Sequence, residues 1–246
     1  MAVADKIGSQ IRYALVRHWE DFNADISGLS GVASIQPKDG WSVFVYMGAE
    51  GNSANFELTP IVVNLPERAP GVTSDLFVVI KGRLSIDRSH FEVAGKIRTL
   101  NFATKAAYFR QKGSKLTHVY GAHYDFTANE IGHPVFHVQM RSFEEFSHEI
   151  KNREYGLEEA EVTDLVKGIL KTVRLPSAQM DVFSFLLQLV ADHLLSTDSG
   201  DDDKTRFREL LDRSKFIQGL GSQVARLQAP PANLCYRAVH WYPPDP

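Results

Sequence analysis

The sequence is poor in cysteine and in long apolar runs. It contains a single cysteine, Cys235, which excludes an intramolecular disulfide framework and any metal site built from several thiolates. The N-terminus lacks the continuous apolar run of a signal peptide, and no segment approaches the roughly 20 apolar residues of a membrane-spanning helix. These absences predict a cytoplasmic protein that does not act at a membrane.

Acidic residues are missing from one long segment of the chain. Residues 93–124 contain no Asp or Glu, and their basic residues are Lys96, Arg98, Lys105, Arg110, Lys112 and Lys115. Because the whole chain has a net charge of -3, the remainder is acidic, and the contrast predicts a basic face on an acidic body. Lysines on strands also protect exposed sheet edges, so a solvated surface is the alternative interpretation.

The first half of the chain has the periodicity of one helix followed by a sheet. Hydrophobic residues form 43% of the sequence, and between Ala4 and Phe22 they recur every three or four positions, which predicts an amphipathic helix. Turn residues at 37–40, with Gly40 at a positive φ, predict a hairpin between two extended runs. Further extended segments are expected at 55–64, 76–86, 91–110, 116–125 and 134–141, with a turn at 112–114. Their short connections favour an antiparallel meander.

After Arg141 the period becomes helical. A capping-box match at 142–145 predicts a short helix, and the later helices are expected at 157–173, 177–195 and 204–220, followed by a late strand at 233–243. Residues 177–195 are apolar on nearly all sides, which predicts a buried central helix. The expected fold class is α+β. The organisation is either a sheet domain at 1–141 with a helical part at 142–246, or one single domain.

Residues 123–140, HYDFTANEIGHPVFHVQM, concentrate titratable groups around an expected turn. Strand alternation puts His123 and Asp125 on one face and His118, with two tyrosines, on the other. If the antiparallel register places His137 opposite His123 or Asp125, three polar groups meet on one face, whereas a slip of one residue separates them.

Such a cluster suits two kinds of chemistry. His123 and His137 can act as general base and general acid on a phosphodiester, with Asp125 as the orienting carboxylate. In this metal-independent nuclease, Lys105, Arg110 and Lys112 are the expected phosphate contacts. Alternatively, His123, Asp125 and His137 hold a divalent metal such as Zn or Mn, with Glu130 or His133 as a further ligand. A purely structural role, with half-buried histidines and Asp125 capping the loop, is the third interpretation.

The phrases HYDF at 123–126 and HPVFH at 133–137 resemble short His/Asp phrases in small bacterial proteins from toxin–antitoxin and phage-defence operons. The resemblance covers about 20 residues. It implies a bacterial setting and an RNA- or nucleotide-directed activity.

The leading functional hypothesis is therefore phosphodiester or nucleotide recognition, with hydrolysis as a possible consequence, at the hairpin of residues 118–139. Its ligand would be a nucleic acid or a nucleotide. Two alternatives remain open. One is a non-enzymatic subunit that binds a partner protein through its sheet and helical surface, and the other is a small-molecule sensor with its ligand between sheet and helices.

Overall fold

The computed structural model of the protein describes residues 5–29, 34–66, 75–126, 136–165, 174–176, 180–195, 199–214 and 217–218. Its strands form a sheet with the order β1-β3-β4-β5-β6-β7-β9, in which β2 also pairs with β3, β8 with β6 and β10 with β5. All neighbours are antiparallel except β8 and β10, which run parallel to their partners. The expected α+β class and the largely antiparallel sheet are confirmed.

The strands that build the sheet are β1 (Ser34–Gln36), β2 (Phe44–Glu50), β3 (Ser53–Pro66), β4 (Asp75–Asp87), β5 (Ile97–Lys112), β6 (Lys115–Phe126), β7 (Phe136–Met140), β8 (Glu161–Asp164), β9 (Arg174–Pro176) and β10 (Ile217–Gln218). The helices are α1 (Lys6–Ser27), α2 (Arg88–Ala94), α3 (Ser147–Lys151), α4 (Val182–His193) and α5 (Asp201–Ser214), with short 3-10 turns η1 (Gly40–Ser42) and η2 (Glu144–Phe146).

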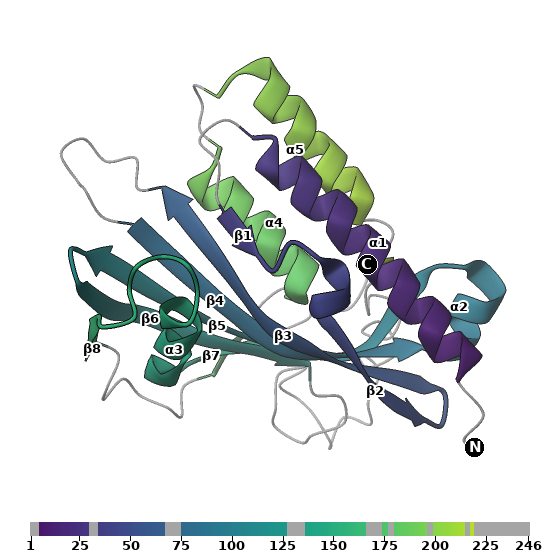
Figure 1. Ribbon diagram of the computed structural model, residues 1–246. Helices are drawn as coiled ribbons and strands as arrows, with labels where there is room; N and C mark the ends of the chain where they lie inside the picture. The colour runs from purple at the N-terminus through teal and green to yellow at the C-terminus, as the bar shows by residue number, and fades with distance from the viewer. Residues whose placement is uncertain are drawn as a thin grey trace.

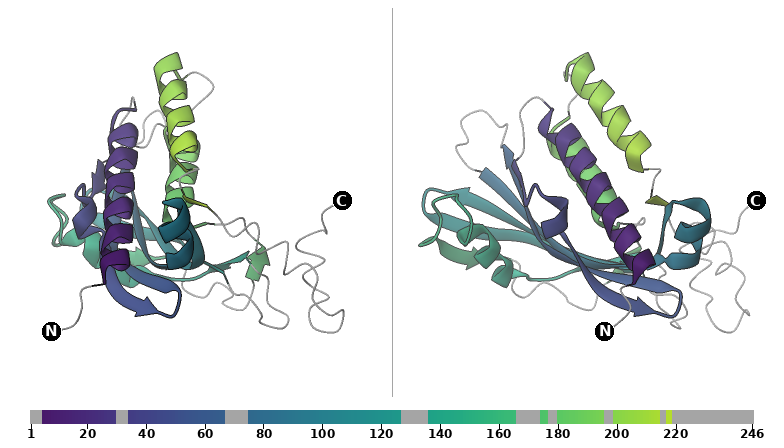
Figure 2. Two further views of the ribbon diagram at one scale, coloured as in Figure 1. Left: turned by 90° about the vertical axis from the view of Figure 1, so that its right-hand side faces the viewer. Right: turned by 45° about the vertical axis from the view of Figure 1, so that its right-hand side comes forward.

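Helices α1, α4 and α5 lie together on one side of the sheet, as Figure 1 and the two views of Figure 2 show. The predicted apolar stripe of α1 is buried, and Phe183 of α4 completes an aromatic cluster with it. The Phe183 ring centroid lies 5.5 Å from that of Phe22, 6.5 Å from that of Trp19 and 6.1 Å from that of Phe44 on β2. Burial of these large rings is a main stabilising contribution of the helix layer.

The opposite face of the sheet is covered only in part. Alternate side chains of the central strands, among them Phe77, Val79 and Phe109, form a second apolar cluster there with Phe146 and Ile150 of the η2–α3 segment. Gly121 makes this cover possible, because a Cβ at this position would lie 2.1 Å from the carbonyl oxygen of Arg141. The rest of this face has no helix upon it in the described part of the chain.

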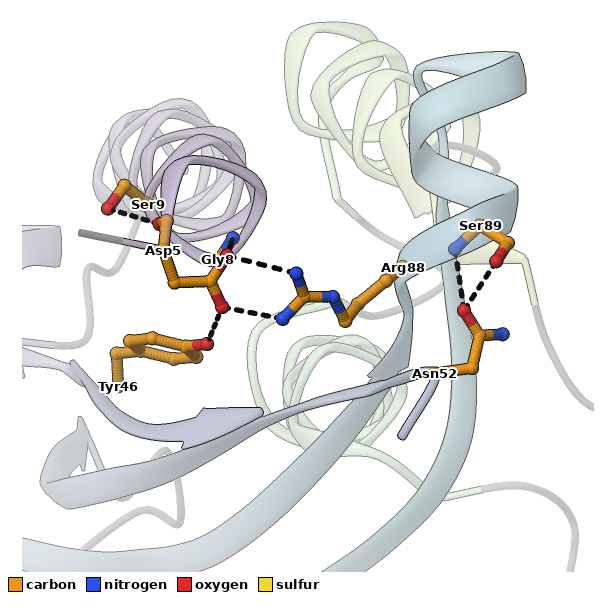
Figure 3. A network of polar contacts seen from close by, with 7 residues as sticks. All are labelled: Asp5, Gly8, Ser9, Tyr46, Asn52, Arg88 and Ser89. Carbon is orange, nitrogen blue, oxygen red and sulfur yellow. Dashed lines mark hydrogen bonds and ion pairs between the residues drawn. The ribbon is translucent and has the colours of Figure 1, made fainter. Parts of the chain in front are cut away.

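A polar network fastens the N-terminus of α1 to α2 and β2 (Figure 3). Asp5 caps α1 by accepting the Gly8 amide, binds the Arg88 guanidinium through both carboxylate oxygens at 2.5 and 3.0 Å, and accepts the Tyr46 hydroxyl. The hydrogen bond from Tyr46, with those from Gly8 and Arg88, lowers the pKa of Asp5 to about 2. Since its members satisfy one another, we assign this network a structural role.

The expected hairpin at 37–40 is wrong. Strands β1 and β2 do not pair with each other; both pair with β3, at residues 62–64 and 53–58 respectively. The connection between them contains η1, which lies against α1. Gly40 is needed there for space rather than for a positive φ, because its Cβ would lie 2.8 Å from the Val16 carbonyl oxygen.

Several element boundaries also differ from the expectation. Residues 91–94 of the expected extended run belong to α2, and residues 161–164 of the expected helix at 157–173 form strand β8. The capping box is absent, because the Ser142 hydroxyl donates to Asp164 and no side chain caps η2 or α3. The helix expected from residue 204 begins three residues earlier, so that the acidic residues 201–203 form the first turn of α5. The late strand at 233–243, with Cys235, lies outside the described residues.

Candidate functional site

A groove of about 590 Å³ lies on the sheet face that the large helices leave uncovered. Its floor is made by neighbouring strands in register. Lys81 of β4, Lys105 of β5 and His123 of β6 form one cross-strand row, and Arg83, Ala103 and Asp125 form the next. Because directly paired residues project to the same face, the sheet brings these polar side chains together from segments distant in sequence.

The antiparallel register of β6 and β7 brings His137 opposite Asp125, as the expected His/Asp cluster requires. Asp125 pairs directly with His137 of β7, and His123 pairs with Gln139. Asp125 Oδ1 lies 2.7 Å from His137 Nδ1, and Asp125 Oδ2 lies 3.6 Å from His123 Nε2. The carboxylate therefore holds His137 by a short contact and stands near His123 without a hydrogen bond to it.

The two histidines differ in their access to the groove. The His137 side chain is only 2% exposed and lies outside the groove lining, whereas the His123 and Asp125 side chains are 16% and 22% exposed and line it. A buried imidazole nitrogen 2.7 Å from a carboxylate oxygen restricts the orientation of that carboxylate. The geometry therefore makes His137 a positioning residue for Asp125. It does not place His137 as an acid that reaches a groove ligand.

His123 is set to be neutral near neutral pH. Burial lowers the pKa of His123 below its ordinary value, and the nearby positive charge of Lys105 acts in the same direction, while Asp125 opposes both. A neutral imidazole at the edge of an open groove can accept a proton or a hydrogen bond from a ligand.

Only one of the three expected phosphate contacts belongs to the groove. Lys105 lines it, but Arg110 and Lys112 lie five and seven residues farther along β5, about 17 Å or more away at the usual strand rise. Both also alternate to the other face of the sheet. The structure therefore does not bring Arg110 and Lys112 to this groove, because a run of basic residues along a strand is divided between its two faces.

Two cations that the sequence analysis missed complete the groove, namely Lys81 and Arg83 of β4. Lys81 pairs with Glu149 of α3 at 2.6 Å and lies 4.7 Å from the centroid of the Phe146 ring. In the described part of the chain neither Arg83 nor Lys105 has an ion-pair partner. In the sequence, these two residues could have been recognised by their i, i+2 spacing, which places two positive charges on one face of an otherwise apolar strand.

The expected position of His118 is wrong because β6 contains a bulge. Tyr120 pairs with Tyr108 and His118 with Phe109, so Val119 is an extra residue that transfers His118 to the face of His123. There its Nδ1 lies 2.8 Å from Asp164 Oδ1, while Asp164 Oδ2 accepts the Ser142 hydroxyl at 2.6 Å.

This buried set of Ser142, Asp164 and His118 is not a nucleophile–base arrangement. Ser142 bonds to the carboxylate rather than to the imidazole, and the side chains of His118 and Asp164 are 0% and 4% exposed. A nucleophilic serine needs a base within reach of its own proton and access to a substrate. The contacts instead join β8 to β6, whose residues His118 and Asp164 are paired in register.

The described residues contain no group of three or more His, Cys, Asp or Glu side chains that could hold a metal ion. His123, Asp125 and His137 therefore do not by themselves form the metal site considered as an alternative. The further expected ligands, Glu130 and His133, lie outside the described residues. The geometry does place one accessible imidazole, His123, 3.6 Å from the carboxylate of Asp125.

Comparison with protein-family models, with curated proteins and with solved structures finds no match for this chain. Among the described residues, no helix has both the length and the apolar character needed to cross a membrane. No relative therefore indicates a ligand, and the residues that line the groove are the observations that bear on function.

Proposed function

We propose that the groove recognises the phosphate group of a nucleotide or a phosphodiester. The observation that carries the proposal is the gathering of Arg83, Lys105 and His123 on one open sheet face, with no ion-pair partner for Arg83 or Lys105 among the described residues. Arginine and lysine are the usual ligands of phosphate oxygens, and a groove concentrates their field on an anion.

The arrangement of Lys81 and Lys105 supports this assignment. Like charges directly opposite on neighbouring strands destabilise a sheet, and only Lys81 is compensated, by Glu149. A bound phosphate between Arg83 and Lys105 would neutralise the remaining positive charge. Lys105 thus has no ion-pair partner among the described residues, which favours an anionic ligand beside it.

The proposed roles follow from exposure. Arg83 and Lys105 contact the phosphate, His123 donates or accepts the proton of a phosphate oxygen, and Asp125 stands beside His123 with its own position fixed by His137. If a bound ester is hydrolysed, His123, as the accessible imidazole of the pair, accepts the proton of the attacking water as its oxygen bonds to phosphorus. The P–O bond to the leaving group breaks, and the protonated His123 returns the proton to the leaving alkoxide oxygen.

Binding measured by calorimetry tests the proposal. The probes are inorganic phosphate, nucleoside monophosphates, and single-stranded RNA and DNA oligonucleotides. We expect Lys105→Ala to weaken binding by about tenfold, and Lys112→Ala, which removes a lysine of the same strand outside the groove, to leave it unchanged. Affinity should also fall with added salt. A wild type that binds none of the probes refutes the proposal and leaves a protein-contact surface, such as the exposed Tyr13 and Trp41, as the alternative.

A further inference from the structure

Beyond the phosphate contacts, the groove continues into a second part whose additional side chains carry no positive charge. A second hollow of about 390 Å³ shares Glu57, Arg83 and Asn101 with the first, so the two are contiguous along the strands. Its additional lining is uncharged or acidic: Asn55, Ser85, Met47 and Glu50. No lysine lines this second part.

We infer that the groove binds a single nucleotide, with its phosphate at Arg83 and Lys105 and its base in the second hollow. The inference rests on the proposed function and specifies its ligand. It excludes a nucleic-acid strand that runs along the sheet as the ligand.

The side chains of the second hollow suit the edge of a base. Asn55 is held in one orientation, because its Oδ1 accepts both the Ser85 hydroxyl at 2.8 Å and the Ser53 hydroxyl at 3.1 Å, which leaves its amide NH₂ as a positioned donor. Asn101 pairs with Ser85 and is exposed. Asparagine amides recognise base edges, and a methionine such as Met47, 59% exposed here, contacts a flat ring well.

Both ends of the groove limit the ligand to one phosphate-bearing unit. At the phosphate end, Phe146 lines the wall where the chain after β7 crosses close over Gly121. At the other end stands the exposed carboxylate of Glu50, which would repel further phosphates but can accept hydrogen bonds from the amino groups of a base. Glu57, paired directly with Arg83, lines both parts of the groove where they meet. From Lys81 to Ser85 the strand rises about 13 Å, which gives the phosphate and base separate places.

The test compares the affinities of the wild type for inorganic phosphate, the four common ribonucleoside monophosphates, oligo(U) and oligo(dT). We expect at least one monophosphate to bind about tenfold or more tightly than inorganic phosphate, and more tightly than either oligonucleotide. Asn101→Ala should weaken monophosphate binding about fivefold without changing the affinity for inorganic phosphate. Glu50→Gln should reduce the difference between the affinity for the monophosphate and the affinity for the oligonucleotides, because it removes the carboxylate that repels further phosphates. Lys112→Ala is the matched control for both variants.

The same measurements distinguish failure of the single-nucleotide inference from failure of the proposed phosphate recognition. Equal affinity for inorganic phosphate and every monophosphate overturns the base site and leaves phosphate recognition in place. Tighter binding of an oligonucleotide than of any monophosphate overturns the single-nucleotide inference alone. If the folded wild type binds none of these probes, the inference fails together with the proposed function. Melting curves of Asn101→Ala and Glu50→Gln check that both variants fold, as expected for substitutions of exposed side chains.

Discussion

Asp125 and His137 stand directly opposite each other on β6 and β7, and Asp125 Oδ1 lies 2.7 Å from His137 Nδ1. The contact joins a buried imidazole to a carboxylate at the wall of the groove. The pairing of β6 with β7 therefore helps to set the position of Asp125, the carboxylate beside His123. Because the His137 ring is buried, a carboxylate oxygen at this distance is its close polar neighbour across the two strands.

We expect this pair to be energetically coupled. Asp125→Ala removes the carboxylate that lies 2.7 Å from a buried imidazole and should lower the free energy of unfolding by about 1–3 kcal/mol. In a double-mutant cycle with His137→Ala, the double variant should lose less stability than the sum of the single variants. Denaturant unfolding of the four proteins measures the coupling. Strictly additive losses would show that the contact contributes nothing.

The core of α4 offers a test with neighbouring leucines. Leu186 is 1% exposed, whereas Leu187 is only partly buried. Leu186→Ala should therefore cost about 2–5 kcal/mol and Leu187→Ala clearly less. Sequence periodicity favoured Leu187 as an equal member of the core, and the structure corrects that expectation. Equal losses in urea denaturation would contradict the orientation of α4.

The buried Ser142–Asp164–His118 set should affect stability and leave ligand binding unchanged. Asp164→Ala removes the acceptor of both the His118 ring and the Ser142 hydroxyl, so we expect a loss of about 1–3 kcal/mol. Ser142→Ala should cost less, because the imidazole keeps its partner. Unfolding curves and phosphate titrations of both variants provide the check. Loss of binding by a folded Ser142→Ala protein would give this set a functional role.

Acid should destabilise the protein through His18. Burial lowers the pKa of His18 to about 4, outweighing the opposing effect of Asp21. Because the unfolded chain binds this proton near pH 6.5 and the folded protein does not, stability falls as pH drops from about 6.5 to about 4. The contribution is roughly 3 kcal/mol across that window.

The variant His18→Phe tests this dependence, since an apolar ring can keep the packing against Phe183, whose centroid lies 4.6 Å from that of His18. Urea unfolding at pH 7 and pH 4.5 should show a smaller acid-induced loss than in the wild type. His148→Ala, which changes an exposed histidine of α3, is the control. The same acid-induced loss in His18→Phe and the wild type would exclude His18 as its source.

Local patterns predicted the elements whose side chains alternate or repeat regularly. The stripe of α1, the strands β3 and β4, and the turn at Gly113, which has a φ of 57°, could all be recognised from periodicity and turn chemistry. The cluster of His123, Asp125 and His137 was also recognisable, because alternation placed its members on faces that a suitable register brings together.

What the sequence could not supply depends on contacts between distant segments. The bulge at Val119 reverses the face of His118, and no local signal marks it. Strand β8 is short and pairs in parallel with β6, so its four residues read equally well as part of a helix. Lys81 and Arg83 lie at the site because β4 pairs with β5 in this register, and the periodicity of the sequence does not define the register.

The most direct test of phosphate recognition is NMR titration of the imidazole of His123 with and without a saturating nucleoside monophosphate. The free protein should show a His123 pKa below the ordinary value, because the ring is partly buried beside Lys105. Binding of the anion should raise that pKa and shift the His123 ring signals, while the signals of buried His118 stay in place. Ring signals and a pKa of His123 that are unchanged by the ligand would contradict recognition of phosphate in this groove.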